Sequence, residues 1–154
     1  MLIQLLPQRI DNTHRGHWLG LWLFAVVIIM KGGIGLGTIF NGRSAAIDAD
    51  GIPLDSFGSA GADAFVSLFA AWGLSQVMLN LIGLLALIRY RALVPFMFAL
   101  LLLEHLCRKL IFLVLPLARS ESAPGFYINL GIVAVMVAGL ILSLRSQDDL
   151  RSAA

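Results

Sequence analysis

Four long apolar stretches, separated by shorter polar breaks, dominate the pattern of this chain. An α-helix needs about 20 residues to cross about 30 Å of hydrocarbon. The predicted helices cover residues 18–40, 63–88, 92–117 and 125–144, each with enough length to span a bilayer. Residues 41–62 form the one long polar connection, which we expect to be a solvated outer loop. The pattern therefore predicts one all-α domain over residues 1–154, an integral membrane four-helix transmembrane bundle.

The composition excludes a soluble enzyme or a nucleic-acid-binding domain. The chain is 59% apolar and 13% charged, and its mean hydropathy is +0.90. Soluble domains carry about 25% charged residues, and a soluble core of this size buries only about 70% of the surface. The one cysteine, Cys107, permits no intramolecular disulfide. No catalytic, cofactor or metal motif is present, so we expect none of these, and we expect a lipid bilayer as partner and no nucleic acid.

The basic residues near the helix ends predict the topology, because Lys and Arg collect on cytoplasmic loops. Six arginines fall on one side of the membrane: Arg9, Arg15, Arg89, Arg91, Arg145 and Arg151. Arg43 and Arg119 fall on the other side, together with Glu121 and the acidic residues of the loop. Both termini are therefore predicted to be cytoplasmic. The first apolar run continues past Lys31, so we expect a retained membrane helix rather than a cleaved signal peptide.

Several charged and amide side chains lie inside the predicted spans, where inserting each ionisable group costs roughly 2.5–3.5 kcal/mol. The candidate intramembrane polar cluster consists of Lys31, Gln76, Asn80, Glu104, His105 and Arg108. With a rise of about 1.5 Å per residue, Lys31, Gln76 and Glu104 fall near the middle of three different helices. Glu104 and Arg108 are four residues apart and share a helix face. The cluster is therefore predicted to meet at one depth inside the bundle.

Two interpretations of this cluster stay open. In the first it is structural: Lys31 and Glu104 neutralise each other, and Arg108 supports Glu104. In the second it binds or conducts something polar, and the excess of basic groups, with Lys109 added, favours a phosphate or a carboxylate. We expect His105 to be a hydrogen-bonded histidine within the bundle rather than a proton relay or a haem ligand.

Glycines on the first two predicted helices indicate close helix packing. Gly33 and Gly37 form a GxxxG pair, which is common where two membrane helices approach closely. The alternative is that this glycine-rich run unwinds and offers backbone carbonyls to a ligand. On the second helix, Gly73 and Gly83 share the face of the predicted amide residues, so a neighbouring helix can approach there.

A set of different short motifs lies along the first three predicted helices. It consists of Lys31-Gly32, Trp72-Gly73 with Gln76, Arg89-Tyr90-Arg91, Pro95, and Glu104-His105 with Arg108. Together these resemble a family of uncharacterised bacterial proteins that are predicted to have four helices in the inner membrane. The resemblance implies the topology and a bacterial inner-membrane location, and it implies no catalytic activity.

The sequence favours a small multi-pass inner-membrane protein that acts as a non-catalytic binding or accessory subunit. Such a subunit fits a homo-oligomer or a larger membrane complex. One alternative is a small transporter or channel-like carrier for a proton, an ion or an anionic solute. A second alternative is an enzyme or carrier that binds a lipid headgroup.

Overall fold

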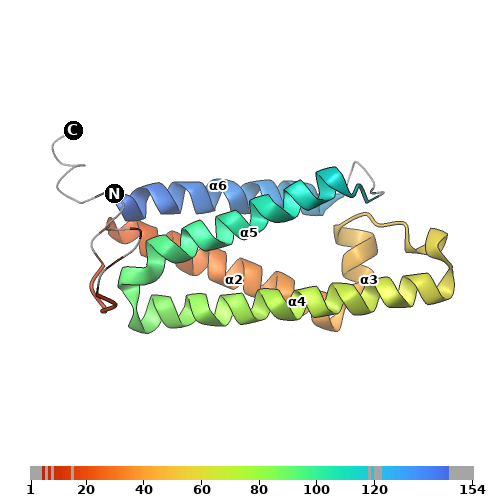
Figure 1. Cartoon of the computed structure of the whole chain (residues 1–154), viewed down its shortest axis with the longest axis horizontal. Helices are drawn as coiled ribbons and strands as arrows, with labels where there is room; N and C mark the ends of the chain where they lie inside the picture. The colour runs from red at the N-terminus through yellow and green to blue at the C-terminus, as the bar shows by residue number, and fades with distance from the viewer. Residues whose placement is uncertain are drawn as a thin grey trace.

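The predicted all-α fold is confirmed for the part of the chain that the structure, a computed structural model, describes: residues 5, 7, 9–14, 16–117, 119 and 123–145. Four long helices lie side by side along the longest axis (Figure 1). They are α2 (Trp18–Phe40), α4 (Gly58–Arg89), α5 (Val94–Val114) and α6 (Pro124–Leu144). The short elements are α3 (Gly42–Ser44), the π-helix η1 (Ala45–Ala49), and the 3₁₀ helices η2 (Leu54–Phe57) and η3 (Arg91–Leu93).

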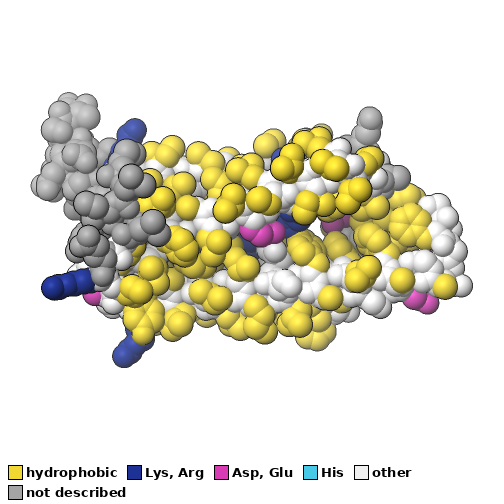
Figure 2. Space-filling model, in the orientation of Figure 1, with side chains coloured by type: hydrophobic (Ala, Val, Ile, Leu, Met, Phe, Trp, Pro, Cys, Tyr) yellow, Lys and Arg dark blue, Asp and Glu magenta, His cyan; other side chains and the backbone are white. Residues whose placement is uncertain are grey.

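Among the residues that the structure describes, three helical segments are long and apolar enough to cross a membrane: Trp18–Phe40, Leu54–Arg89 and Pro124–Leu144. Hydrophobic side chains cover much of the face seen in Figure 2. Helix α5, the remaining predicted span, has 21 residues but carries Glu104, Arg108 and Lys109 in its second half. The structure therefore supports a membrane protein with three candidate spans, and the fourth span stays a prediction.

Two helix boundaries differ from the sequence prediction by three residues or more, each for a physical reason. Helix α4 begins at Gly58, five residues earlier than predicted, after the backbone turns at this glycine with a φ of 69°. A positive φ is readily adopted only by glycine. Helix α5 ends at Val114 rather than at residue 117, because Pro116 disfavours helical backbone at Leu115.

The connection over residues 41–62 differs from the solvated loop that we expected. Most of it is helical, and it folds back over the first turns of α4 (Figure 1). Four of its residues form a small buried core at this end of the molecule: Ala46, Ile52, Leu54 and Ala62. The partly buried Phe57, Phe65 and Phe69 pack against this core. The segment folds because it can cover an apolar face of α4 that would otherwise be exposed at the end of the bundle.

A larger core fills the half of the bundle where α2 begins and α6 ends. Phe24 of α2 and Phe98 of α5 are both fully buried and meet edge to face, with ring centroids 4.9 Å apart. Leu101 of α5, Met136 of α6 and Ala86 of α4 complete the contact between the four helices. The two cores lie at opposite ends of the bundle, with the middle of the helices between them.

The closest approach of α2 and α4 involves glycines, but not the GxxxG pair. A Cβ atom at Gly73 would lie 2.9 Å from the carbonyl oxygen of Gly35. Gly83 likewise packs against Ile28, so the predicted close approach at the two α4 glycines is correct. A Cβ atom at Gly33 or Gly37 would have nothing within 4 Å, so the predicted packing of this GxxxG pair is not found among the described residues of the chain. Helix α2 continues to Phe40, so the glycine-rich run is not unwound.

Candidate functional site

A cavity of about 1290 Å³ lies between the two cores. Its walls come from the middle of the four long helices and from their halves nearer α3, and η1 lies across one end. Five of the six predicted cluster residues line it: Lys31, Gln76, Glu104, His105 and Arg108. The sequence prediction therefore located the polar side of this cavity, although it did not predict the cavity itself.

Three helices contribute to one polar contact in the middle of the bundle. The Lys31 ammonium of α2 donates to Glu104 Oε2 of α5 over 3.1 Å, and the Gln76 amide of α4 donates to Glu104 Oε1 over 3.0 Å. The Lys31 side chain is 6% exposed and that of Glu104 is 22% exposed. The structure thus brings together Lys31, Gln76 and Glu104, which the helical rise per residue had placed at one depth. Because both carboxylate oxygens are engaged, the Lys31 charge is compensated within the bundle.

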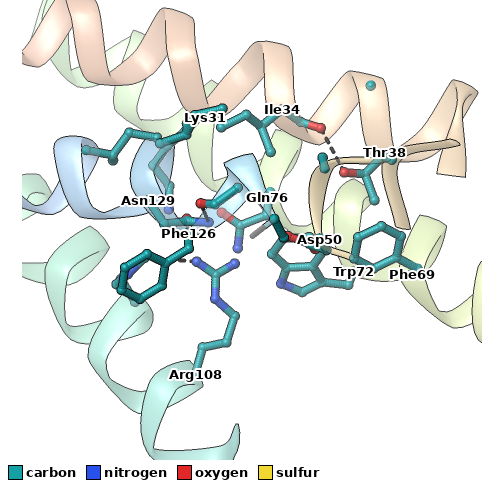
Figure 3. Close-up of a pocket in the computed structure, with 18 of the residues that line it drawn as sticks. Lys31, Ile34, Thr38, Asp50, Phe69, Trp72, Gln76, Arg108, Phe126 and Asn129 are labelled. Atoms are coloured by element: carbon teal, nitrogen blue, oxygen red, sulfur yellow. Dashed lines mark hydrogen bonds between the residues drawn. The ribbon is translucent and has the colours of Figure 1, made fainter. Parts of the chain in front are cut away.

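The Arg108 guanidinium projects from α5 into the cavity (Figure 3). Its Nη2 lies 2.9 Å from His105 Nδ1, and its Nη1 lies 3.8 Å from Glu104 Oε1. Arginine can only donate, so His105 Nδ1 is the acceptor and its Nε2 carries the ring proton. The guanidinium also stacks over Trp72 of α4, 4.7 Å from the ring centroid. His105 and Glu104 on one side and the aromatic face of Trp72 on the other hold Arg108 in place, and its remaining N–H groups can donate to a ligand.

Asn80 is the one predicted cluster residue that does not line the cavity. It is 5% exposed, and its side-chain nitrogen lies 3.4 Å from the position that a Cβ atom at Gly32 would take. Within the described residues, neither of its side-chain polar atoms has a hydrogen-bond partner. Asn80 therefore belongs to the contact between α2 and α4 rather than to the cavity wall.

An aromatic row of α4, which was not predicted from the sequence, also belongs to the site. Phe65, Phe69 and Trp72 follow one another along the helix, with ring centroids 5.6 and 5.4 Å apart, and Arg108 stacks on the last of them. Phe69 and Trp72 line the cavity beside Gln76 (Figure 3). They lie seven and four residues before Gln76, so the helical period was the signal that could have found them.

Asp50 and Arg119 enter the site from outside the helices. Both line the cavity, and Asp50 lies against Gly125 at the start of α6. Burial raises the pKa of the Asp50 carboxyl, against the opposing effect of Arg119 and Arg108. No pattern in the sequence indicates this contact, because it depends on the path by which residues 41–57 fold back.

The charged residues around the cavity are in excess on the basic side. Four basic residues line it: Lys31, Arg108, Lys109 and Arg119. Three acidic residues line it within the part of the chain that the structure describes: Asp48, Asp50 and Glu104. Four against three leaves one net positive charge when all seven are ionised. In an apolar surrounding this uncompensated charge is attractive to an anion, because nearby solvent screens it weakly.

The cavity offers recognition rather than an evident set of reacting groups. Among the described residues, no group of three His, Cys, Asp or Glu side chains is placed to hold a metal ion. Cys107 is exposed, and it lies on the cavity wall. Comparison of the chain with protein-family models, with curated proteins and with solved structures found no match, so the resemblance to four-helix bacterial membrane proteins stays a prediction.

Proposed function

We propose that this chain is a multi-pass protein of a bacterial inner membrane, a four-helix transmembrane bundle with cytoplasmic termini. Three helices have the length and composition of membrane spans. The case for α5 as the fourth is that its Glu104 is paired inside the bundle with Lys31 and Gln76, which lowers the cost of placing it in lipid.

The distribution of arginines supports the proposed orientation. Arg9, Arg89, Arg91 and Arg145 belong to the end where α2 begins and α6 ends, whereas Arg43 and Arg119 belong to the end that carries α3. Three other residues used in the sequence argument, Arg15, Glu121 and Arg151, lie outside the described residues. Among the described residues, four arginines at one end against two at the other still favour a cytoplasmic location for the end where α2 begins and α6 ends.

Within this topology we propose that the protein is a non-catalytic binding or accessory subunit that holds an anionic group in the cavity. The observation that carries the proposal is the Arg108 guanidinium, which points into the cavity while stacked on Trp72. A planar guanidinium presents paired N–H donors that match a carboxylate or a phosphate. The net positive charge of the cavity wall acts in the same direction.

The filled core favours binding over conduction. Phe24, Phe98 and Met136 are fully buried between the cavity and the end of the bundle where α2 begins. Interiors of this kind are close-packed and leave no path for water or ions. A carrier would have to separate these helices in every cycle, whereas a binding protein uses the cavity as it stands.

Native mass spectrometry of the full chain, released from membranes in mild detergent, tests the proposal. We expect a bound small molecule on the wild type that is lost from Arg108→Ala. Arg89→Ala is the matched control, because Arg89 is exposed at a helix end and does not line the cavity. The spectrum also reports the number of chains in the assembly. A wild-type spectrum without any adduct, or an adduct that survives Arg108→Ala, would reject the proposed site.

A further inference from the structure

Both ends of the cavity along the bundle axis are covered. The core around Phe24 and Phe98 covers one end. The other end is covered by η1 and by the small core, against which Leu117 of the α5–α6 connection also packs. In Figure 1, α3 stands between α4 and this connection. A ligand therefore has its shortest route through the side of the bundle.

The side of the cavity opens between α4 and α5. These helices are joined by a short connection at one end and diverge toward the α3 end (Figure 1). Figure 2 shows a hollow between them, in which acidic and basic side chains are visible beneath a largely hydrophobic surface. Charged groups at the bottom of a hollow in an apolar surface form a site that is polar inside and faces lipid outside.

The wall near this opening is apolar. Ile111 and Phe112 of α5 line the cavity and are 55% and 37% exposed. On the facing helix the wall consists of Phe69 and Trp72. The polar wall holds Lys31, Gln76 and Glu104. The Arg108 guanidinium lies near Gln76 and over Trp72 (Figure 3). An acyl chain fits the apolar wall, and an acidic headgroup fits the guanidinium.

We propose that the occupant of the cavity is a membrane amphiphile with one acidic headgroup, a phosphate or a carboxylate, which enters sideways between α4 and α5. This inference rests on the proposed anion-binding function and names the class of its ligand. It distinguishes a lipid from a water-soluble anion, which would need an aqueous route. In the proposed orientation, the cavity lies toward the outer leaflet, so the ligand comes from that leaflet.

Cys107 provides a probe that needs no engineered residue, because it is the only cysteine in the chain. It precedes Arg108, lines the cavity and is exposed. We would measure the alkylation rate of Cys107 by a membrane-soluble maleimide, with the full chain in phosphatidylcholine nanodiscs. Dodecyl phosphate is the test ligand. Inorganic phosphate tests a soluble anion, and dodecyl maltoside tests an uncharged amphiphile.

We expect dodecyl phosphate to slow alkylation, by about tenfold when its concentration is about ten times the Kd. Inorganic phosphate and dodecyl maltoside should leave the rate unchanged. The protection should be lost in Arg108→Ala and kept in Arg89→Ala. The comparison of the three ligands on the wild type decides the inference even where Arg108→Ala does not fold.

Three outcomes would overturn the lipid inference. Equal protection by inorganic phosphate would assign the site to a soluble anion. Equal protection by dodecyl maltoside would make it an apolar groove without headgroup recognition. Protection by none of the three would show that no such amphiphile occupies the cavity. In the first and third cases an adduct that depends on Arg108 in native mass spectrometry would still support the proposed anion site, so the two proposals fail separately.

Discussion

Removal of Glu104 should destabilise the protein more than removal of its partner Lys31. In Glu104→Gln the buried Lys31 side chain loses the only carboxylate within hydrogen-bond distance of its ammonium in the described structure. In Lys31→Met the carboxylate keeps the Gln76 amide at 3.0 Å, and the Arg108 guanidinium is 3.8 Å away. A small movement of Arg108 can then restore a charged contact. The two halves of the ion pair are therefore not equivalent.

The magnitudes follow from what each variant leaves behind. An uncompensated buried charge costs about 3–5 kcal/mol, which we expect for Glu104→Gln. Lys31→Met loses one charge-assisted hydrogen bond and leaves Glu104 paired, so about 1–3 kcal/mol is expected. Simple addition would give about 4–8 kcal/mol for the double variant. We expect it instead to cost no more than Glu104→Gln alone, because replacing both members of a buried pair leaves no orphaned charge.

Reversible unfolding in mixed detergent micelles, followed by circular dichroism, measures these free energies. Arg89→Gln is the control for loss of a charge at an exposed position, and we expect it to stay within about 0.5 kcal/mol of the wild type. The reasoning would be refuted by additive effects in the double variant. It would also be refuted if Lys31→Met cost as much as Glu104→Gln, because Arg108 would then give the carboxylate no support.

Two further predictions concern packing and pH. Gly73→Ala places a methyl group 2.9 Å from the Gly35 carbonyl oxygen and should lower the free energy of unfolding by about 1–3 kcal/mol in the same measurement. Gly37→Ala is the control, because its methyl group meets open space and should not destabilise the protein. Equal losses of stability in the two variants would contradict the close contact of Gly73 with Gly35. Burial lowers the pKa of His14 from 6.5, so the unfolded state binds more protons than the folded state and stability falls as pH decreases through 6.5. His14→Gln should weaken the pH dependence of the unfolding midpoint. An equally steep pH dependence in that variant would show that another group causes it.

The common depth of Lys31, Gln76 and Glu104 could be predicted from the sequence, because helix geometry alone fixes it. Lys31, Gln76 and Glu104 lie at similar depths in continuous helices, so the rise per residue placed them correctly. The i,i+4 relation of Glu104 and Arg108 holds for the same reason. The rise and period of a helix determine the depth of these residues and their i,i+4 relations, whereas the contacts between helices also require the right faces to meet.

The glycine contact could not be predicted with the same rule. The GxxxG spacing of Gly33 and Gly37 describes one face of α2, and Gly35 lies on the opposite side of the helix. Which face meets α4 depends on the rotation of α2 about its axis, and the buried positions Val27, Lys31 and Gly35 set that rotation. A motif on a single helix does not contain this information.

The covered end of the cavity depends on residues that look like an ordinary loop. Ile52 and Leu54 are 2% and 1% exposed, although they are surrounded by polar and glycine residues in the sequence. These two residues are buried because the connection over residues 41–62 folds back across α4, and no short sequence pattern indicates that path. Sequence reasoning therefore finds the charged groups but not the walls that turn them into a site.

The placement of the two cores explains why the charged cluster can persist in an apolar chain. The ion pair of Lys31 and Glu104 is costly to desolvate, and a bundle stabilised only at this point would gain little from it. The core around Phe24 and Phe98 holds one end of the helices, and the core around Ile52 holds the other. The middle of the four helices therefore does not have to be closely packed for the bundle to be stable. A cavity with an arginine at its wall can be maintained there, and its charged groups remain available for a ligand.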